Sequence, residues 1–137
     1  MKKTVSNSKD IEQAKKRLGK KIKMLRESKK DNISQNALAK EIGLPRSNMK
    51  YIEDGVNAPT ATVYDAIISY LNPNDKMREE MDNLFTTIRG TPPPDICKIV
   101  CDNKALYSAL RELKDIELSE EQTQIIINTL KSVRGEK

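Results

Sequence analysis

Residues 34–59 decide the fold, and they read SQNALAKEIGLPRSNMKYIEDGVNAP. The pattern predicts two short helices that meet at Gly43, because glycine readily takes the left-handed backbone conformation that ends a helix. Ser34 is a suitable N-cap for the first helix, since its hydroxyl can accept a hydrogen bond from an unpaired backbone amide. Pro45 suits the first turn of the second helix, where its missing N–H costs nothing.

The second helix has a buried edge and an exposed front. Met49 and Ile52 are three residues apart and supply the buried edge. The front presents basic, polar and aromatic side chains to the outside, as a helix that enters a DNA major groove requires. The candidates for DNA contact are Pro45, Arg46, Ser47, Asn48, Lys50 and Tyr51, with Asn48 ranked last because it can also turn inward.

At these positions the chain resembles the Xre/Cro, or lambda-repressor-like, helix-turn-helix family of DNA-binding regulators. The resemblance implies an all-α fold, with a five-helix lambda-repressor-like DNA-binding domain followed by a small helical C-terminal dimerisation region. It also implies that residues 45–53 form the recognition helix, that Gln35 binds a phosphate, and that Arg46 is the best candidate for a guanine edge. It extends over about residues 26–71 and is carried by Gln35, Leu38, Ala39, Gly43, Ile52, Glu53, Gly55 and Pro59.

The resemblance further implies an ion pair between Arg26 and Glu53. A half-buried glutamate needs a cation, and the planar guanidinium of arginine fits a carboxylate best. We expect this pair to tie the first helix to the recognition helix. Its role is structural, since the loss of one partner would leave the other charge buried without compensation.

The net charge of +5 is unevenly distributed. Residues 1–30 contain twelve Lys and Arg against three Asp and Glu, whereas the rest of the chain is slightly acidic. A basic excess beside a helix-turn-helix suggests a polyanion partner, and a solvated helix face is the alternative. Because the sequence has neither a long apolar run nor a signal-peptide pattern, we expect a cytoplasmic protein without a membrane span.

Apolar periodicity and proline positions divide the chain into four parts. A run of prolines near residue 90 marks a semi-rigid linker, because proline cannot continue a helix and stiffens an extended chain. The predicted parts are a flexible basic tail (1–9), a helix-turn-helix domain (10–89), a Pro-rich linker (90–94) and a helical C-terminal region (95–137).

The last predicted helix begins at Ser119, where the sequence SEEQ has the pattern of a capping box. A two-helix tail cannot bury the apolar side chains that follow, so we expect them to pack on a second copy of the chain. Packing onto the first domain and binding of another protein are the alternatives. The candidate dimerisation residues are Ile125, Ile126, Ile127, Leu130 and Val133.

The sequence offers little for catalysis or for metal binding. It has no histidine, which removes the commonest general base and metal ligand. Cys97 and Cys101 share one helical face, but a metal site would need further soft ligands, and we expect two small buried residues in place of a redox or metal sensor. We therefore expect no enzyme activity, no cofactor and no metal.

The most plausible function is that of a homodimeric transcriptional repressor that binds a palindromic operator in double-stranded DNA. Two-fold symmetry would place two recognition helices about 34 Å apart, which matches half-sites one turn apart. One alternative is an antitoxin-type autorepressor whose C-terminal helices bind a partner protein. Another is a protein-interaction adaptor without DNA binding, against which Arg46 and Lys50 argue.

Overall fold

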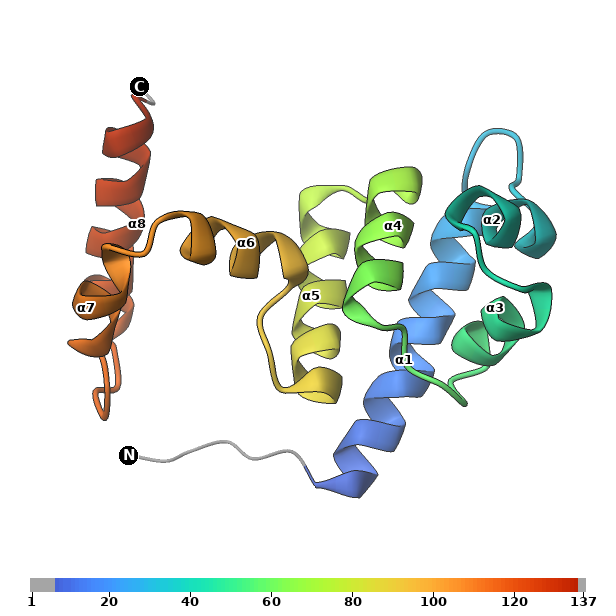
Figure 1. Ribbon diagram of the computed structural model, residues 1–137, viewed down its shortest axis with the longest axis horizontal. Coiled ribbons are helices and arrows are strands. Elements are labelled where there is room, and N and C mark those ends of the chain that lie inside the picture. Colours follow the sequence, from blue (N-terminus) through green and yellow to red (C-terminus); the bar gives the residue numbers. More distant parts are fainter. Residues whose placement is uncertain (1–6, 136–137) are drawn as a thin grey trace. The chain divides into compact units, whose positions relative to one another are not determined.

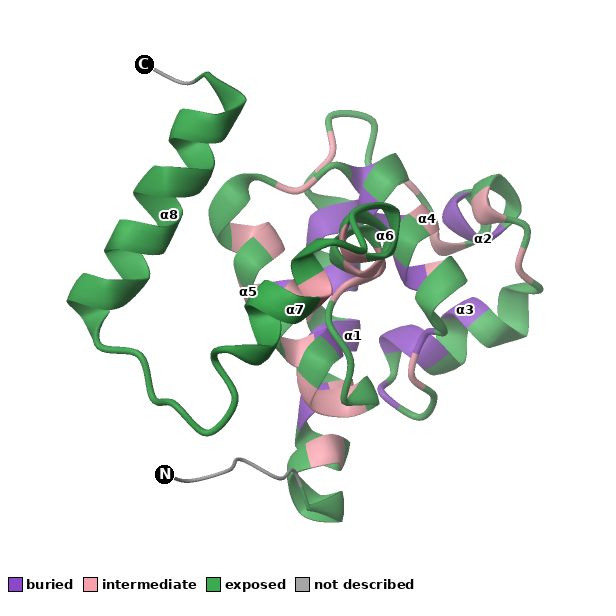
Figure 2. Cartoon of the chain, turned by 60° about the vertical axis from the view of Figure 1, so that its left-hand side comes forward, coloured by how far each residue is buried: buried purple, intermediate pink, exposed green. Residues whose placement is uncertain are grey.

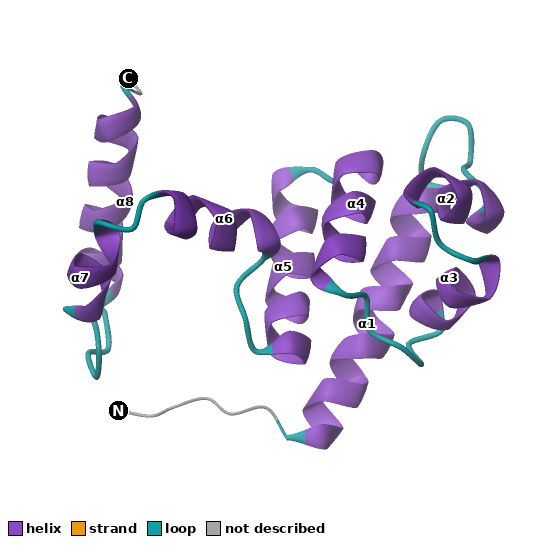
Figure 3. Ribbon diagram, in the orientation of Figure 1, coloured by secondary structure: helices purple, strands orange, loops and turns teal. Residues whose placement is uncertain are grey.

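The computed structural model describes residues 7–135, and within this range every regular element is a helix (Figures 1 and 3). The contacts divide the chain into two compact units, with the boundary between Asp102 and Asn103. The first unit contains α1 (Ser8–Glu27), α2 (Gln35–Ile42), α3 (Arg46–Glu53), α4 (Ala61–Leu71), α5 (Asp75–Arg89) and α6 (Pro94–Asp102); the second contains α7 (Leu106–Arg111) and α8 (Glu120–Arg134).

The core of the first unit forms where α1 packs along α5 and where α2 packs against α3 and α4. Figure 2 shows the buried residues on the sides of these helices that face one another. Tyr64 is fully buried and stacks on Phe85 with ring centroids 4.5 Å apart. Its hydroxyl donates a hydrogen bond of 2.7 Å to Asp82, and burial followed by this contact raises the pKa of Tyr64 well above its ordinary value.

Local capping sets the ends of the helices, as the sequence predicts. The Ser34 hydroxyl accepts from the backbone N–H of Ala37 at 3.0 Å, and Gly43 ends α2 with a φ of 76°. Ser119 and Gln122 form the reciprocal bonds of a capping box at the start of α8. Helix α3 begins one residue later than predicted, because Pro45 is its N-cap and Arg46 its first helical residue.

Two predicted boundaries differ from the structure. The tail predicted over 1–9 overlaps α1, because Asn7 caps that helix and it begins at Ser8; residues 1–6 lie outside the described range. The linker predicted over 90–94 does not separate the two units. Residue Pro94 already begins α6, which packs on α4 and whose Asp95 accepts a hydrogen bond of 3.0 Å from Arg78.

The second unit, residues 103–135, buries none of its large apolar side chains. Its leucine, isoleucine and valine side chains are each more than a third exposed, and neither α7 nor α8 has a buried residue. The exposed residues are Leu106, Leu110, Leu113, Ile116, Leu118, Ile125, Ile126, Ile127, Leu130 and Val133.

No helix between residues 7 and 135 is long and apolar enough to cross a bilayer.

Helices α1 and α3 approach each other closely at Gly19. A Cβ atom at this buried position would lie 2.5 Å from the carbonyl oxygen of Glu53 and closer still to that of Ile52. The neighbouring atoms belong to the backbone, so no side-chain rotation could make room for it. A glycine in the middle of α1 therefore allows the last turn of α3 to rest directly on the first helix.

We predict that Gly19→Ala destabilises the protein by about 1–3 kcal/mol, the usual cost of an overfilled contact. Helix propensity alone would predict the opposite sign, since alanine stabilises a helix interior by about 1 kcal/mol relative to glycine. Urea unfolding gives the free energy of unfolding of both forms. Lys20→Ala is the control, because that side chain is exposed on the same turn; a variant of Gly19 as stable as the parent would contradict the account.

Candidate nucleic-acid interface

Helix α3 has one buried side and one exposed side. Met49 and Ile52 point into the core, with 0% and 5% exposure, and Glu53 is buried with them. All six residues that the sequence marks as candidates for DNA contact are exposed. These are Pro45, Arg46, Ser47, Asn48, Lys50 and Tyr51, whereas Gln35, for which the resemblance implies a phosphate contact, is half-buried.

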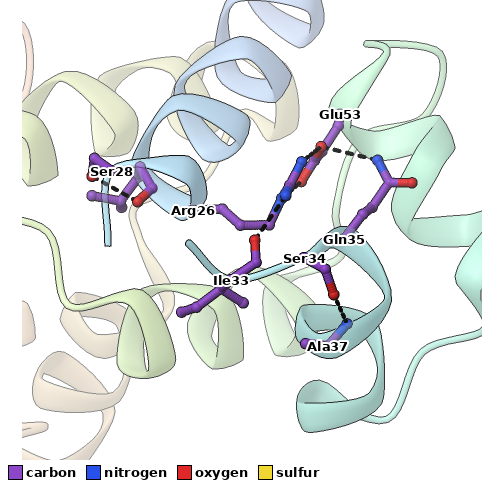
Figure 4. A network of polar contacts seen from close by, with 8 residues as sticks. Arg26, Ser28, Ile33, Ser34, Gln35, Ala37 and Glu53 are labelled. Atoms are coloured by element: carbon purple, nitrogen blue, oxygen red, sulfur yellow. Dashed lines mark hydrogen bonds and ion pairs between the residues drawn. The ribbon is translucent and has the colours of Figure 1, made fainter. Parts of the chain in front are cut away.

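The predicted pair of Arg26 and Glu53 is present and is almost fully removed from solvent. Arg26 donates from Nε to Oε2 and from Nη2 to Oε1 of Glu53, both at 2.8 Å (Figure 4). The two side chains are only 8% and 1% exposed. The hydrogen bonds that Arg26 donates to the Glu53 carboxylate raise the pKa of Arg26 and favour its charged form. Two parallel bonds fix the angle between the planes as well as the distance.

The pair also organises the segment that leads to α2. Arg26 donates a third hydrogen bond, of 2.8 Å from Nη1, to the carbonyl oxygen of Ile33. Gln35 donates from Nε2 to Oε1 of Glu53 at 2.9 Å (Figure 4). One cluster of four residues therefore joins α1, the 28–34 loop, α2 and α3; we call it the Arg26 cluster (Arg26, Ile33, Gln35, Glu53).

The resemblance implies that Gln35 binds a phosphate, and within the protein its side chain bonds to Glu53. The side chain is half-buried and its amide N–H group points at Glu53, because the carboxylate can accept more hydrogen bonds than Arg26 supplies. The spacing of Arg26, Gln35 and Glu53 in the sequence is the signal that could have shown that Arg26 and Gln35 both donate to the buried carboxylate of Glu53. The start of α2 remains at the surface, with Ser34 exposed.

The two cations of α3 are in different states. Lys50 donates to Asp54 at 2.8 Å, and this hydrogen bond raises the pKa of Lys50. Within the described residues, Arg46 makes no hydrogen bond or ion pair through its side chain. Arg46 is therefore available to an external anion or base, whereas Lys50 has to exchange Asp54 for such a partner.

Further positive charge lies on α1 beside α3. The backbone of Lys16 lies close to Gly55, which follows the last turn of α3. A Cβ atom on that glycine would lie 2.6 Å from the Lys16 Cα atom. Lys16, Lys20 and Lys23 recur at helical spacing and are all exposed. No side chain caps the N-terminus of α3, which leaves backbone N–H groups there for a solvent or ligand acceptor.

The cysteines differ from the expectation of two buried residues. Cys97 is half-buried, with its Sγ atom 3.5 Å from the carbonyl oxygen of Pro92, and Cys101 is exposed. That expectation was wrong because α6 packs on α4 without burying any of its own residues completely. Among residues 7–135, no group of three Cys, Asp or Glu side chains is placed to hold a metal ion.

We predict that Glu53→Gln lowers the free energy of unfolding by about 3 kcal/mol, because it leaves the Arg26 charge buried without a counterion. Asp54→Asn is the matched control: it removes the acid of the exposed Lys50 pair and should change stability by less than about 1 kcal/mol. Chemical unfolding of both variants provides the comparison. Equal losses in the two would show that the Arg26 cluster does not hold α1 and α3 together.

Three comparisons with known proteins give no further guidance on this surface. A scan against protein-family models, a search of curated proteins and a search of solved structures each returned no match.

Proposed function

We propose that the chain is a sequence-specific regulator of transcription that binds double-stranded DNA through α3 and represses by occupying its site. The observation that carries this proposal is the exposed front of α3, where Arg46 has no partner within the described residues and stands beside polar side chains. A rigid helix with an arginine near its N-terminus suits readout of a guanine edge, since arginine can bond both acceptors of guanine in the major groove.

The charges around α3 support contact with the DNA backbone. Lys16, Lys20 and Lys23 form an exposed row on α1, and α1 approaches α3 closely at Gly19. Phosphate contacts of this kind give affinity and set the register of the protein on the duplex, whereas base contacts give specificity. The uncapped N-terminus of α3 adds backbone N–H donors that suit a phosphate oxygen.

Lys50 has a second role in this scheme, since its bond to Asp54 competes with DNA. Asp54 lowers the positive potential of the front of α3 when no DNA is bound. Near a phosphate or a guanine, Lys50 can leave Asp54 at little cost, because an exposed ion pair of this kind contributes little to stability. Lys50 would thus favour DNA only where a suitable acceptor is within its reach.

The test is Arg46→Ala, measured on a duplex enriched from a random pool and on an unrelated duplex of equal length. We predict a loss of about 1–3 kcal/mol on the enriched duplex, the value of one good bidentate base contact, and little change on the unrelated one. Fluorescence anisotropy at fixed salt gives both affinities. Ser69→Ala, on the exposed side of α4, is the control; equal losses on the two duplexes would contradict base readout by Arg46.

Salt provides a separate prediction for the row on α1. Each phosphate contact releases counterions, so the logarithm of the binding constant should fall with the logarithm of salt concentration by nearly one unit per contact. Lys20→Ala should reduce this slope by about one and weaken binding to all duplexes alike. The same anisotropy titration at several salt concentrations measures it. An unchanged slope would show that Lys20 does not contact a phosphate.

A second candidate function is favoured by the exposed apolar side chains of α7 and α8. In an antitoxin-type autorepressor, the same DNA-binding unit would act while this region holds another protein. The chain can be purified from its native cell together with any protein bound to it. The mass of the complex then distinguishes a bound second protein from self-association.

A further inference from the structure

A hollow of about 500 Å³ opens in the first unit beside α3. Its walls come from the start of α1, from α3, from the loop between α3 and α4, and from the end of α5. A volume of this size is typical of sites that hold a small organic molecule, and such sites have mainly apolar walls with a few polar groups. The apolar side chains that line the hollow are Ile11, Leu44, Ile52, Val56, Val63 and Ile88.

Arg89 brings a positive charge to one wall of the hollow. Its Nε atom donates to the carbonyl oxygen of Pro59 and its Nη2 atom to that of Ala58, each at 3.1 Å. These acceptors are neutral, and within the described residues Arg89 has no carboxylate partner. A guanidinium has five N–H donors, so Arg89 holds the loop between α3 and α4 and keeps donors for an external anion.

Lys15 is the second cation of the hollow. Its side chain is only 18% exposed and approaches Glu12, which is 61% exposed, at 3.3 Å. An exposed acid of this kind holds its partner weakly, so Lys15 can exchange Glu12 for an anion in the hollow. Among the described residues no Asp or Glu lines the hollow, whereas Thr60, the N-cap of α4, does. The positive end of the α4 dipole therefore adds to the same potential.

We propose that this hollow binds a small carboxylate with a hydrocarbon body, with the carboxylate held by Arg89 and Lys15. Burial of the hydrocarbon against the apolar walls favours binding, and hydrogen bonds from a guanidinium suit a carboxylate. A phosphate offers the charge without the apolar body and leaves these walls uncovered. Asn48 and Ile52 of α3 also line the hollow, so its occupant touches the helix proposed to bind DNA. The inference rests on the proposed function only for this regulatory use.

The test is an amide-resolved NMR titration of the full chain with hexanoate, at neutral pH and without DNA. We expect saturable shifts at residues 56–60 and 88–89. 1-Hexanol lacks the charge, and acetate and inorganic phosphate lack the apolar body. Each of these three probes should bind at least about tenfold more weakly at the same residues, because each loses one of the two contributions. Shifts that are confined to α7 and α8, or equal binding of 1-hexanol or phosphate, would overturn the proposal.

Two variants test the cations separately. Arg89→Gln and Lys15→Gln should each weaken hexanoate binding about tenfold, the usual effect of one lost hydrogen bond to a charged group. Lys15 holds no backbone group among the described residues, so its variant tests the charge without loosening the loop between α3 and α4. Circular dichroism verifies the fold of each variant.

Arg17→Gln is the matched control, because Arg17 is exposed on α1 and does not line the hollow. We expect it to leave hexanoate binding almost unchanged. Losses as large as those of the other two variants, or no loss in either Lys15→Gln or Arg89→Gln, would contradict a carboxylate site at these cations. Since no DNA is present in the titration, a chain that enriches no duplex would contradict the proposed function alone.

Discussion

The buried ion pair between Arg26 and Glu53 is the interaction on which the first unit depends. Bidentate geometry fixes α3 against α1, and the bonds to Ile33 and Gln35 extend the same constraint to the loop and to α2. A charged pair in this position is costly to desolvate, so it is tolerated only because every bond is made. What it provides is orientation: Met49 and Ile52 face the core, and the front of α3 faces outward.

The helices and most of their ends could be predicted from the sequence, because caps act over three or four residues. Ser34, Gly43 and Ser119 each stop or start a helix through bonds to their close neighbours. Apolar spacing likewise identified the buried side of α3. These features depend on residues that are close together in the chain, so they can be predicted from a single sequence.

Contacts between distant segments were less predictable. The direction of the Gln35 side chain depends on the unfilled acceptors of Glu53, which only the folded chain brings near. Burial of Tyr64 depends on a partner for its hydroxyl, and Asp82 lies on a different helix. The prolines of residues 92–94 mark a break in the backbone, but they do not reveal that α6 returns to pack on α4 and moves the boundary to Asp102.

The most direct measurement of the central claim is an amide-resolved NMR titration of the chain with a duplex enriched from a random pool. If the front of α3 enters the DNA, the largest shifts fall on residues 45–51, with smaller shifts along the exposed lysines of α1. Shifts confined to residues outside α3, or no shifts at low ionic strength, would contradict the assignment of this surface to DNA.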